Sequence, residues 1–213
     1  MNEIVAGRDD RLKGSNVVGM LSRSCVDPLT PDWRDVSLED VARGLAATRR
    51  FIGQARVPFI VAAHSLHVAD HAPRKFRLAA LLHDGHEYVT GDIITPIARA
   101  LDKLRPGSAA GLDWIKRGVD QAIASRVFDA YATAAAFADG AAIEAEILVE
   151  EMRSTEVKRA DRLAFEIEND LRFRVGPLDN DYFDMTEAFA ASQWLDAVRK
   201  ATEARFAGQG AAA

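Results

Sequence analysis

The sequence is short of two kinds of residue, and both shortages limit what the protein can be. Cys25 is the only cysteine among 213 residues, so no intramolecular disulfide can form and a reducing cytoplasm is the expected compartment. The 27 Lys and Arg are outnumbered by 32 Asp and Glu, which gives a net charge of −5. Binding to a nucleic-acid backbone needs a concentrated basic face. We therefore expect a small-molecule partner and no nucleic acid.

The chain also lacks a long apolar run near its start. Residues 1–13 carry charges such as Glu3, Arg8 and Asp9, so we expect neither a secretory signal nor a membrane contact. No internal repeat is visible, and 48% hydrophobic residues over this length favour one domain with a full core. We place an N-terminal extension and loop at 1–36, the domain at 37–207, and a frayed tail at 208–213.

Helical periodicity dominates the predicted domain. Ser37 is a cap for a helix that ends near Arg49, and Pro28 and Pro31 mark a loop before it. The residues expected to face inward in the later helices include Trp114, Val119, Ile123, Val127, Ala160, Leu163, Ala164, Ile167, Phe189, Trp194, Leu195 and Val198. Further helices are predicted over 59–71, 112–128, 131–137, 143–152, 155–174 and 182–206, with a short extended or turn segment over 17–25.

A His-Asp pair stands at the end of an apolar helical stretch. The residues from Leu78 to Leu82 predict burial, which brings His83 and Asp84 into an interior or a cleft. An unpaired carboxylate is costly in such a setting, and a divalent cation would remove that cost. If the helix continues, Glu87 projects to the same side as the pair. One His-Asp dipeptide is weak evidence, because it occurs by chance in many proteins.

Two further segments supply ligand types in similar surroundings. His64 lies on an apolar helix upstream, and Asp161 lies on a third helix far downstream. His67 and His71 share the helical face of His64, so spacing alone does not choose among the three histidines. Mixed nitrogen and oxygen ligation fits Mn²⁺, Co²⁺, Fe²⁺ or Zn²⁺.

The pattern His64…His83-Asp84…Asp161 resembles the HD superfamily of metal-dependent phosphohydrolases, over roughly residues 37–171. The resemblance implies an all-α HD-domain helical bundle, one divalent metal ion (Mn, Co, Fe, Zn or Mg) and a homo-oligomer. The chain looks most like bacterial and phage HD hydrolases related to 5′-deoxynucleotidases, in the segments Arg50-Phe-Ile-Gly-Gln54, His64-Ser-Leu66, His83-Asp-Gly-His-Glu87 and Gly91-Asp-Ile-Ile-Thr-Pro96.

The resemblance also implies roles for individual residues. It makes Arg50 a contact of the substrate phosphate, a task that suits the paired donors of a guanidinium. It makes Glu87 and Asp92 the groups that orient or deprotonate the nucleophile. The implied metal ligands are His64, His83, Asp84 and Asp161.

One departure from the relatives leaves the substrate open. Those relatives commonly carry a phosphate-binding lysine where this chain has Ala98, and Arg99 points about 100° away on an ideal helix. The resemblance implies a (deoxy)nucleoside 5′-monophosphate phosphatase. The alternatives are a deoxynucleoside triphosphate triphosphohydrolase and a non-catalytic nucleotide or metal sensor. Guanosine tetraphosphate hydrolases fit less well, because Tyr88 follows Glu87, and the chain has no Gly-Tyr-Pro element typical of the cyclic-dinucleotide branch.

Overall fold

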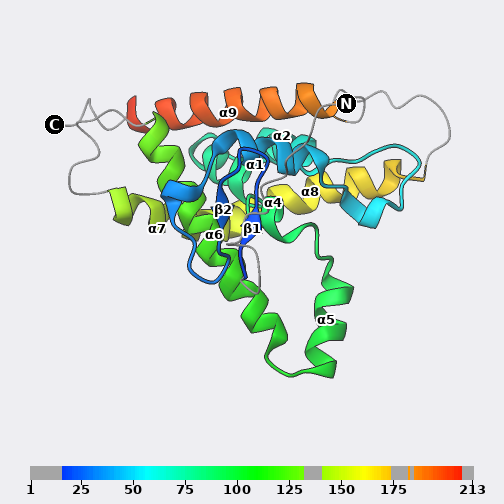
Figure 1. Ribbon diagram of the computed structural model, residues 1–213. Coiled ribbons are helices and arrows are strands. Elements are labelled where there is room, and N and C mark those ends of the chain that lie inside the picture. Colours follow the sequence, from blue (N-terminus) through cyan, green and yellow to red (C-terminus); the bar gives the residue numbers. More distant parts are fainter. Residues whose placement is uncertain (1–15, 132–140, 174–181, 183–184, 208–213) are drawn as a thin grey trace, which may run out of the picture.

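The fold is all-α, as predicted. A computed structural model describes residues 16–131, 141–173, 182 and 185–207 (Figure 1). Short 3₁₀ turns are η2 (Trp33–Asp35), η3 (Arg50–Gly53) and η4 (Arg74–Phe76), and β1 (Val18–Gly19) pairs antiparallel with β2 (Cys25–Val26). The helices are α1 (Leu38–Ala47), α2 (Val61–His71), α3 (Arg77–Leu82), α4 (Glu87–Thr90), α5 (Thr95–Leu104), α6 (Ser108–Tyr131), α7 (Ala141–Met152), α8 (Thr155–Leu171) and α9 (Glu187–Ala207).

Helices α2 and α3 form the centre of the body. Helix α2 packs against α1, α3, α8 and α9, and it is buried over residues 61–69. Helix α9 lies across one side of the body, and the fully buried Trp194 donates its indole N–H to the carbonyl of Leu81 at 2.9 Å (Figure 1). This bond joins α9 to the end of α3, close to the predicted His-Asp pair.

The predicted start of the first helix is confirmed, and several other helix ends differ from the prediction by a few residues. The Ser37 hydroxyl accepts a hydrogen bond from the Asp40 backbone N–H at 3.3 Å and begins α1. Helix α2 begins two residues later than predicted, because the Phe59 carbonyl accepts a hydrogen bond from Arg50 N–H at 2.8 Å and Ile60 bridges Arg49. Helix α8 ends at Leu171, and the helix predicted from 182 begins at 187. The helix predicted over 131–137 lies almost wholly outside the described residues, as do residues 1–15 and the tail at 208–213.

Some predicted core positions are wrong. Trp114 is 58% exposed because α5 and the first half of α6 form an arm that projects from the body (Figure 1). Leu163, Ile167 and Phe189 are also exposed, whereas Ala160, Ala164, Trp194 and Val198 are buried as predicted. On α8 the buried residues are Val157, Ala160, Ala164 and Glu168, so Leu163 and Ile167 lie on the outer side.

The helix does not continue through Glu87, which was the condition for Glu87 to project to the same side as His83 and Asp84. Helix α3 ends at Leu82, and residues 83–86 form a turn before α4. The Gly85 N–H donates to the Leu82 carbonyl at 2.8 Å, and a Cβ at Gly85 would lie 2.9 Å from that same oxygen. The turn therefore needs glycine at this position.

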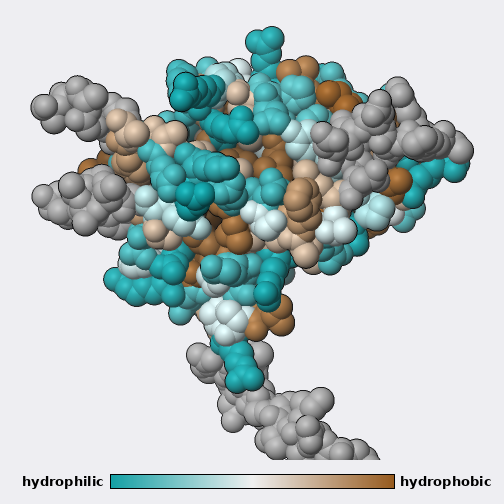
Figure 2. Space-filling model, turned by 90° about the horizontal axis from the view of Figure 1, so that it is seen from above, coloured by the Kyte–Doolittle hydropathy of each residue, from teal (hydrophilic) through white to brown (hydrophobic). Residues whose placement is uncertain are grey.

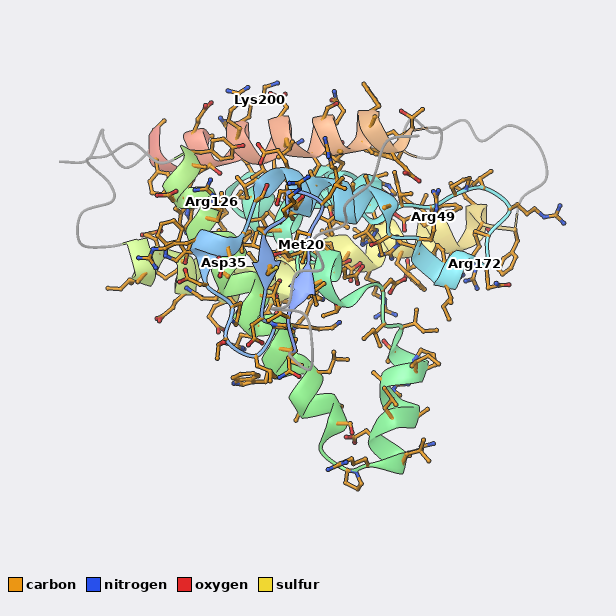
Figure 3. All side chains as sticks on the ribbon, viewed as in Figure 1. Met20, Asp35, Arg49, Arg126, Arg172 and Lys200 are labelled. Carbon is orange, nitrogen blue, oxygen red and sulfur yellow. The ribbon has the colours of Figure 1, made fainter. Side chains whose placement is uncertain are left out.

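The outer surface is mixed in polarity. Figure 2 views the molecule from the α9 side and shows hydrophilic side chains over most of that face, with smaller hydrophobic patches among them. Lys200 points outward from α9 and pairs with Asp196 at 2.6 Å (Figure 3). Among the described helices none has the length and apolarity that crossing a bilayer requires.

Candidate metal centre

Three of the predicted ligands come together from three different elements. One ligand atom each of His64 on α2, His83 in the turn after α3, and Asp161 on α8 lie within 4.8 Å of one another. The Asp161 Oδ1 atom is 3.2 Å from His64 Nε2 and 4.0 Å from His83 Nε2.

The fourth predicted ligand, Asp84, lies beside the same two nitrogens. Its Oδ2 atom is 3.2 Å from His83 Nε2 and 3.6 Å from His64 Nε2. At metal–ligand bonds of roughly 2.1 Å, neighbouring ligand atoms lie about 3.0–3.4 Å apart and opposite ones about 4.2 Å. Each carboxylate therefore lies at a distance from the two Nε2 atoms that ligands of one divalent ion would have.

The hydrogen bonds of both histidines direct Nε2 toward this cluster. His64 Nδ1 lies 2.9 Å from Glu168 Oε1, and His83 Nδ1 lies 2.8 Å from the Ala80 carbonyl oxygen. Both partners accept, so each neutral ring carries its proton on Nδ1 and has a lone pair on Nε2. Across residues 16–131, 141–173, 182 and 185–207, neither buried Nε2 atom has a hydrogen-bond partner of suitable geometry. Lone pairs that face carboxylate oxygens require a cation or a proton between them, so the site fits a metal ion.

The electrostatics of the cluster lead to the same conclusion. Burial by itself would lower the pKa of His83, but the Asp84 carboxylate outweighs burial and raises that pKa to about 9. Burial would raise the pKa of Asp84, yet His83, His64 and Arg50 hold it well below its usual range. Without an ion, the cluster therefore attracts protons.

Glu168 is a member of the site to which sequence reasoning gave no role. It is 1% exposed on α8, and its Oε1 atom accepts from His64 and, at 3.1 Å, from His67. Its Oε2 atom lies 3.0 Å from Arg50 Nε. These partners outweigh burial and hold the pKa of Glu168 below its usual range. The signal in the sequence was a glutamate on the same face as Asp161, among small apolar residues.

Arg50 reaches the cluster from an unusual backbone. Its side chain is 11% exposed, and Nη1 lies 3.5 Å from Asp84 Oδ2. The next two residues, Phe51 and Ile52, have φ of 56° and 55°, a left-handed conformation that costs roughly 1–2 kcal/mol per non-glycine residue. Phe51 packs edge-on against Phe59, and the Arg172 guanidinium lies 4.7 Å from the Phe51 ring centre.

Of the two predicted catalytic carboxyls, Glu87 lies close to Asp84, with one ligand atom of each within 4.8 Å of the other. Glu87 is buried, and burial followed by the Asp84 carboxylate raises its pKa to about 10. Asp92 is half-buried; burial raises its pKa although Arg50 opposes the shift. Arg99 differs from both, because it is exposed on α5 and makes no ion pair with any described residue.

His67 and His71 extend away from the ligand cluster. His71 Nε2 lies 3.2 Å from His67 Nε2, and His67 Nδ1 lies 3.1 Å from Glu168 Oε1. A groove of about 920 Å³ lies nearby, between α2, the start of α3 and α9. It is lined by residues such as Asp70, Arg74 and Lys200 and by none of the predicted site residues.

Comparisons with known proteins add a partial relative. No family model matches the chain. An uncharacterised protein of Rhodobacter capsulatus is 44% identical over 93 residues, which cover 39% of this chain and 47% of that protein. The chain thus spans about half the length of this curated relative, whose name states no activity.

Proposed function

We propose that the protein is a metal-dependent phosphohydrolase of the HD type that acts on nucleotides, with a (deoxy)nucleoside 5′-monophosphate as substrate. One observation carries the proposal: two buried Nε2 lone pairs converge with the carboxylates of Asp84 and Asp161. A site of this composition neutralises a divalent ion and still leaves positions for water and a phosphate oxygen.

Arg50 supports a phosphate substrate. Its Nε atom lies 3.0 Å from Glu168 Oε2 and its Nη1 atom lies 3.5 Å from Asp84 Oδ2, so the guanidinium stands between Glu168 and the cluster. A guanidinium with its Nε fixed still offers several donors to phosphate oxygens. Arg50 therefore binds and orients the phosphate in this proposal.

Glu87 and Asp92 handle the proton of the nucleophile. Burial and Asp84 raise the pKa of Glu87, so this side chain holds a proton in the metal-free protein; a cation beside Asp84 would oppose that shift and free the carboxylate to accept a proton. The Asp92 carboxylate also contributes to the raised pKa of Glu87. A bound divalent ion supplies the remaining chemistry, by polarising a phosphate oxygen and lowering the pKa of water.

Triphosphate removal from a deoxynucleoside triphosphate is the second candidate. Ala98 stands where relatives of the proposed family carry a phosphate-binding lysine, and Arg99 is exposed on α5. A site without that lysine has less reason to prefer a monophosphate.

Product analysis distinguishes these functions. The metal-stripped protein would be resupplied with Mn²⁺, Co²⁺, Mg²⁺ or Zn²⁺ and given deoxynucleoside mono- and triphosphates. We expect phosphate and nucleoside from monophosphates; triphosphate plus nucleoside would favour the second candidate.

Two variants and a control complete the test. Asp161→Asn should lose both the ion and turnover, whereas Glu166→Gln on the exposed side of the same helix should lose neither. Glu87→Ala should lose turnover and retain the ion at His64, His83 and Asp161. Full turnover in Asp161→Asn, or no turnover of any substrate by metal-loaded protein, would refute the proposal; the second result is expected of a sensor.

A further inference from the structure

Two histidines at the end of α2, outside the ligand cluster, face each other through the atoms that bind metals. His67 and His71 are four residues apart, their Nε2 atoms lie 3.2 Å from each other, and their ring centres are 4.9 Å apart. At metal–ligand bonds of roughly 2.1 Å, neighbouring ligand atoms of one ion lie about 3.0–3.4 Å apart. Two histidines at this spacing on one helical face bind zinc in metalloproteases. The pair therefore has the separation that two ligands of one ion would have.

Glu168 determines which nitrogen of His67 faces His71. His67 is 4% exposed, and its Nδ1 atom lies 3.1 Å from Glu168 Oε1. A carboxylate only accepts, so the neutral ring carries its proton on Nδ1 and directs the lone pair of Nε2 toward His71. The Tyr182 ring stacks on His67 with a centre separation of 4.9 Å and fixes the plane of the imidazole. A carboxylate behind the ring is the usual partner of a metal-binding histidine.

The charges around His71 favour a cation. Burial, followed by His67, holds the pKa of His71 below its ordinary value of 6.5 although Asp70 opposes the shift, so this imidazole is neutral at pH 7 and able to bind an ion. Helix α2 ends at His71, and the negative end of a helix dipole attracts cations. His71 is exposed, so an ion can enter directly from solvent.

We propose that His67 and His71 bind one further transition-metal ion through their Nε2 atoms, separate from the cluster around His64 and His83, with water completing the coordination. Two imidazoles suit Zn²⁺ or Cu²⁺ better than Mn²⁺ or Mg²⁺, which prefer oxygen ligands. The inference goes beyond the proposed function and does not depend on it. The two sites share no ligand, but Glu168 Oε1 accepts from both His64 and His67, so one carboxylate orients a histidine of each.

Zinc binding tests the site without any substrate. The metal-free full chain would be dialysed against Zn²⁺ and, in a parallel sample, against Mn²⁺, and the bound metal would be counted. We expect about one more Zn²⁺ than Mn²⁺ per chain, because the ligand set around Asp161 accepts either ion whereas the histidine pair selects zinc.

Reciprocal variants identify the residues. His71→Gln changes an exposed side chain and should bind about one Zn²⁺ fewer than the unchanged protein, with the same amount of Mn²⁺. His67→Gln should lose the same Zn²⁺; if this buried variant fails to fold, His71→Gln decides. Asp161→Asn is the control, because it should lose the Mn²⁺ and retain the Zn²⁺ of the histidine pair.

The outcomes separate this inference from the proposed function. Equal Zn²⁺ counts in His71→Gln and the unchanged protein would overturn the histidine site, since the 3.2 Å contact would then be a hydrogen bond between two rings. That result would leave the function standing if nucleotides are hydrolysed. Loss of one Zn²⁺ in His71→Gln, in a protein that hydrolyses no nucleotide, would support the site and overturn the function.

Discussion

Replacing Glu168 by glutamine should weaken metal binding although Glu168 is not a predicted ligand. Its Oε1 atom receives the His64 Nδ1 proton at 2.9 Å, and its Oε2 atom lies 3.0 Å from Arg50 Nε. A glutamine can still accept from His64, but its amide N–H₂ then faces the Arg50 N–H, so two donors oppose each other.

The size of the effect follows from these contacts. Loss of a carboxylate that orients a metal-binding histidine typically costs 10–100-fold in metal affinity, about 1.4–2.7 kcal/mol. In the metal-free protein, Arg50 loses the nearer of its two carboxylate partners and keeps Asp84 at 3.5 Å, so the free energy of unfolding should fall by less than the roughly 3–5 kcal/mol that a fully unpaired buried charge costs. Mn²⁺ titration calorimetry and urea unfolding of the metal-free protein measure the two effects separately.

The pH dependence gives the same prediction an independent readout. Because the folded state holds the pKa of Glu168 below its ordinary value of 4.5, the stability from this carboxylate is present above pH 4.5 and is lost as the pH falls below it. Glu168→Gln should remove that part of the acid-side loss. The control is Glu166→Gln, whose exposed pair with Arg162 should contribute no more than about 1 kcal/mol. We expect Glu168→Gln to bind the metal roughly tenfold or more weakly than the unchanged protein. An affinity within about twofold of the unchanged protein would refute the reasoning.

Three further predictions concern the elements around the site. In the metal-free protein Asp84 outweighs burial and raises the pKa of His83 from 6.5 to about 9. The stability contributed by the His83 proton is therefore complete below pH 6.5 and is lost as the pH rises through about 9, so the melting temperature of the metal-free protein should fall over that interval. His83→Gln should flatten this profile. Gly85→Ala would place a Cβ 2.9 Å from the Leu82 carbonyl oxygen and should destabilise the fold by about 1–3 kcal/mol in urea unfolding, with an unchanged midpoint as the contrary result. Trp194→Phe leaves the Leu81 carbonyl without its indole donor and should cost about 1–3 kcal/mol in the same assay, whereas a loss well below that range would mean that the bond adds little.

The helices could be predicted because their signals are local. Ser37 and Ser154 cap α1 and α8 through their own side chains, and the buried residues of α2 are continuous in sequence. The exposure of Trp114 was not predictable from periodicity, because a repeat of apolar residues does not say how far a helix extends beyond the body that covers it.

The candidate site also has residues that the sequence indicated and an arrangement that it did not. His64, His83 and Asp161 were selected by resemblance, and their convergence depends on how α2, α3 and α8 pack, which spacing along the chain does not contain. The role of Glu168 depends on two bonds to residues more than a hundred positions away. Neighbours that distant leave no local pattern in the sequence.

The left-handed pair Phe51–Ile52 affects how tightly a ligand of Arg50 can be held. A flexible arginine loses rotamer and backbone freedom when it captures an anion, and that lost entropy weakens binding by about 0.5–1.5 kcal/mol per immobilised side chain. Here the guanidinium is already ordered by Glu168 and by a backbone turn locked under the Phe51 ring contacts. Folding therefore restricts this side chain in advance, and an anion that meets it encounters a rigid receptor.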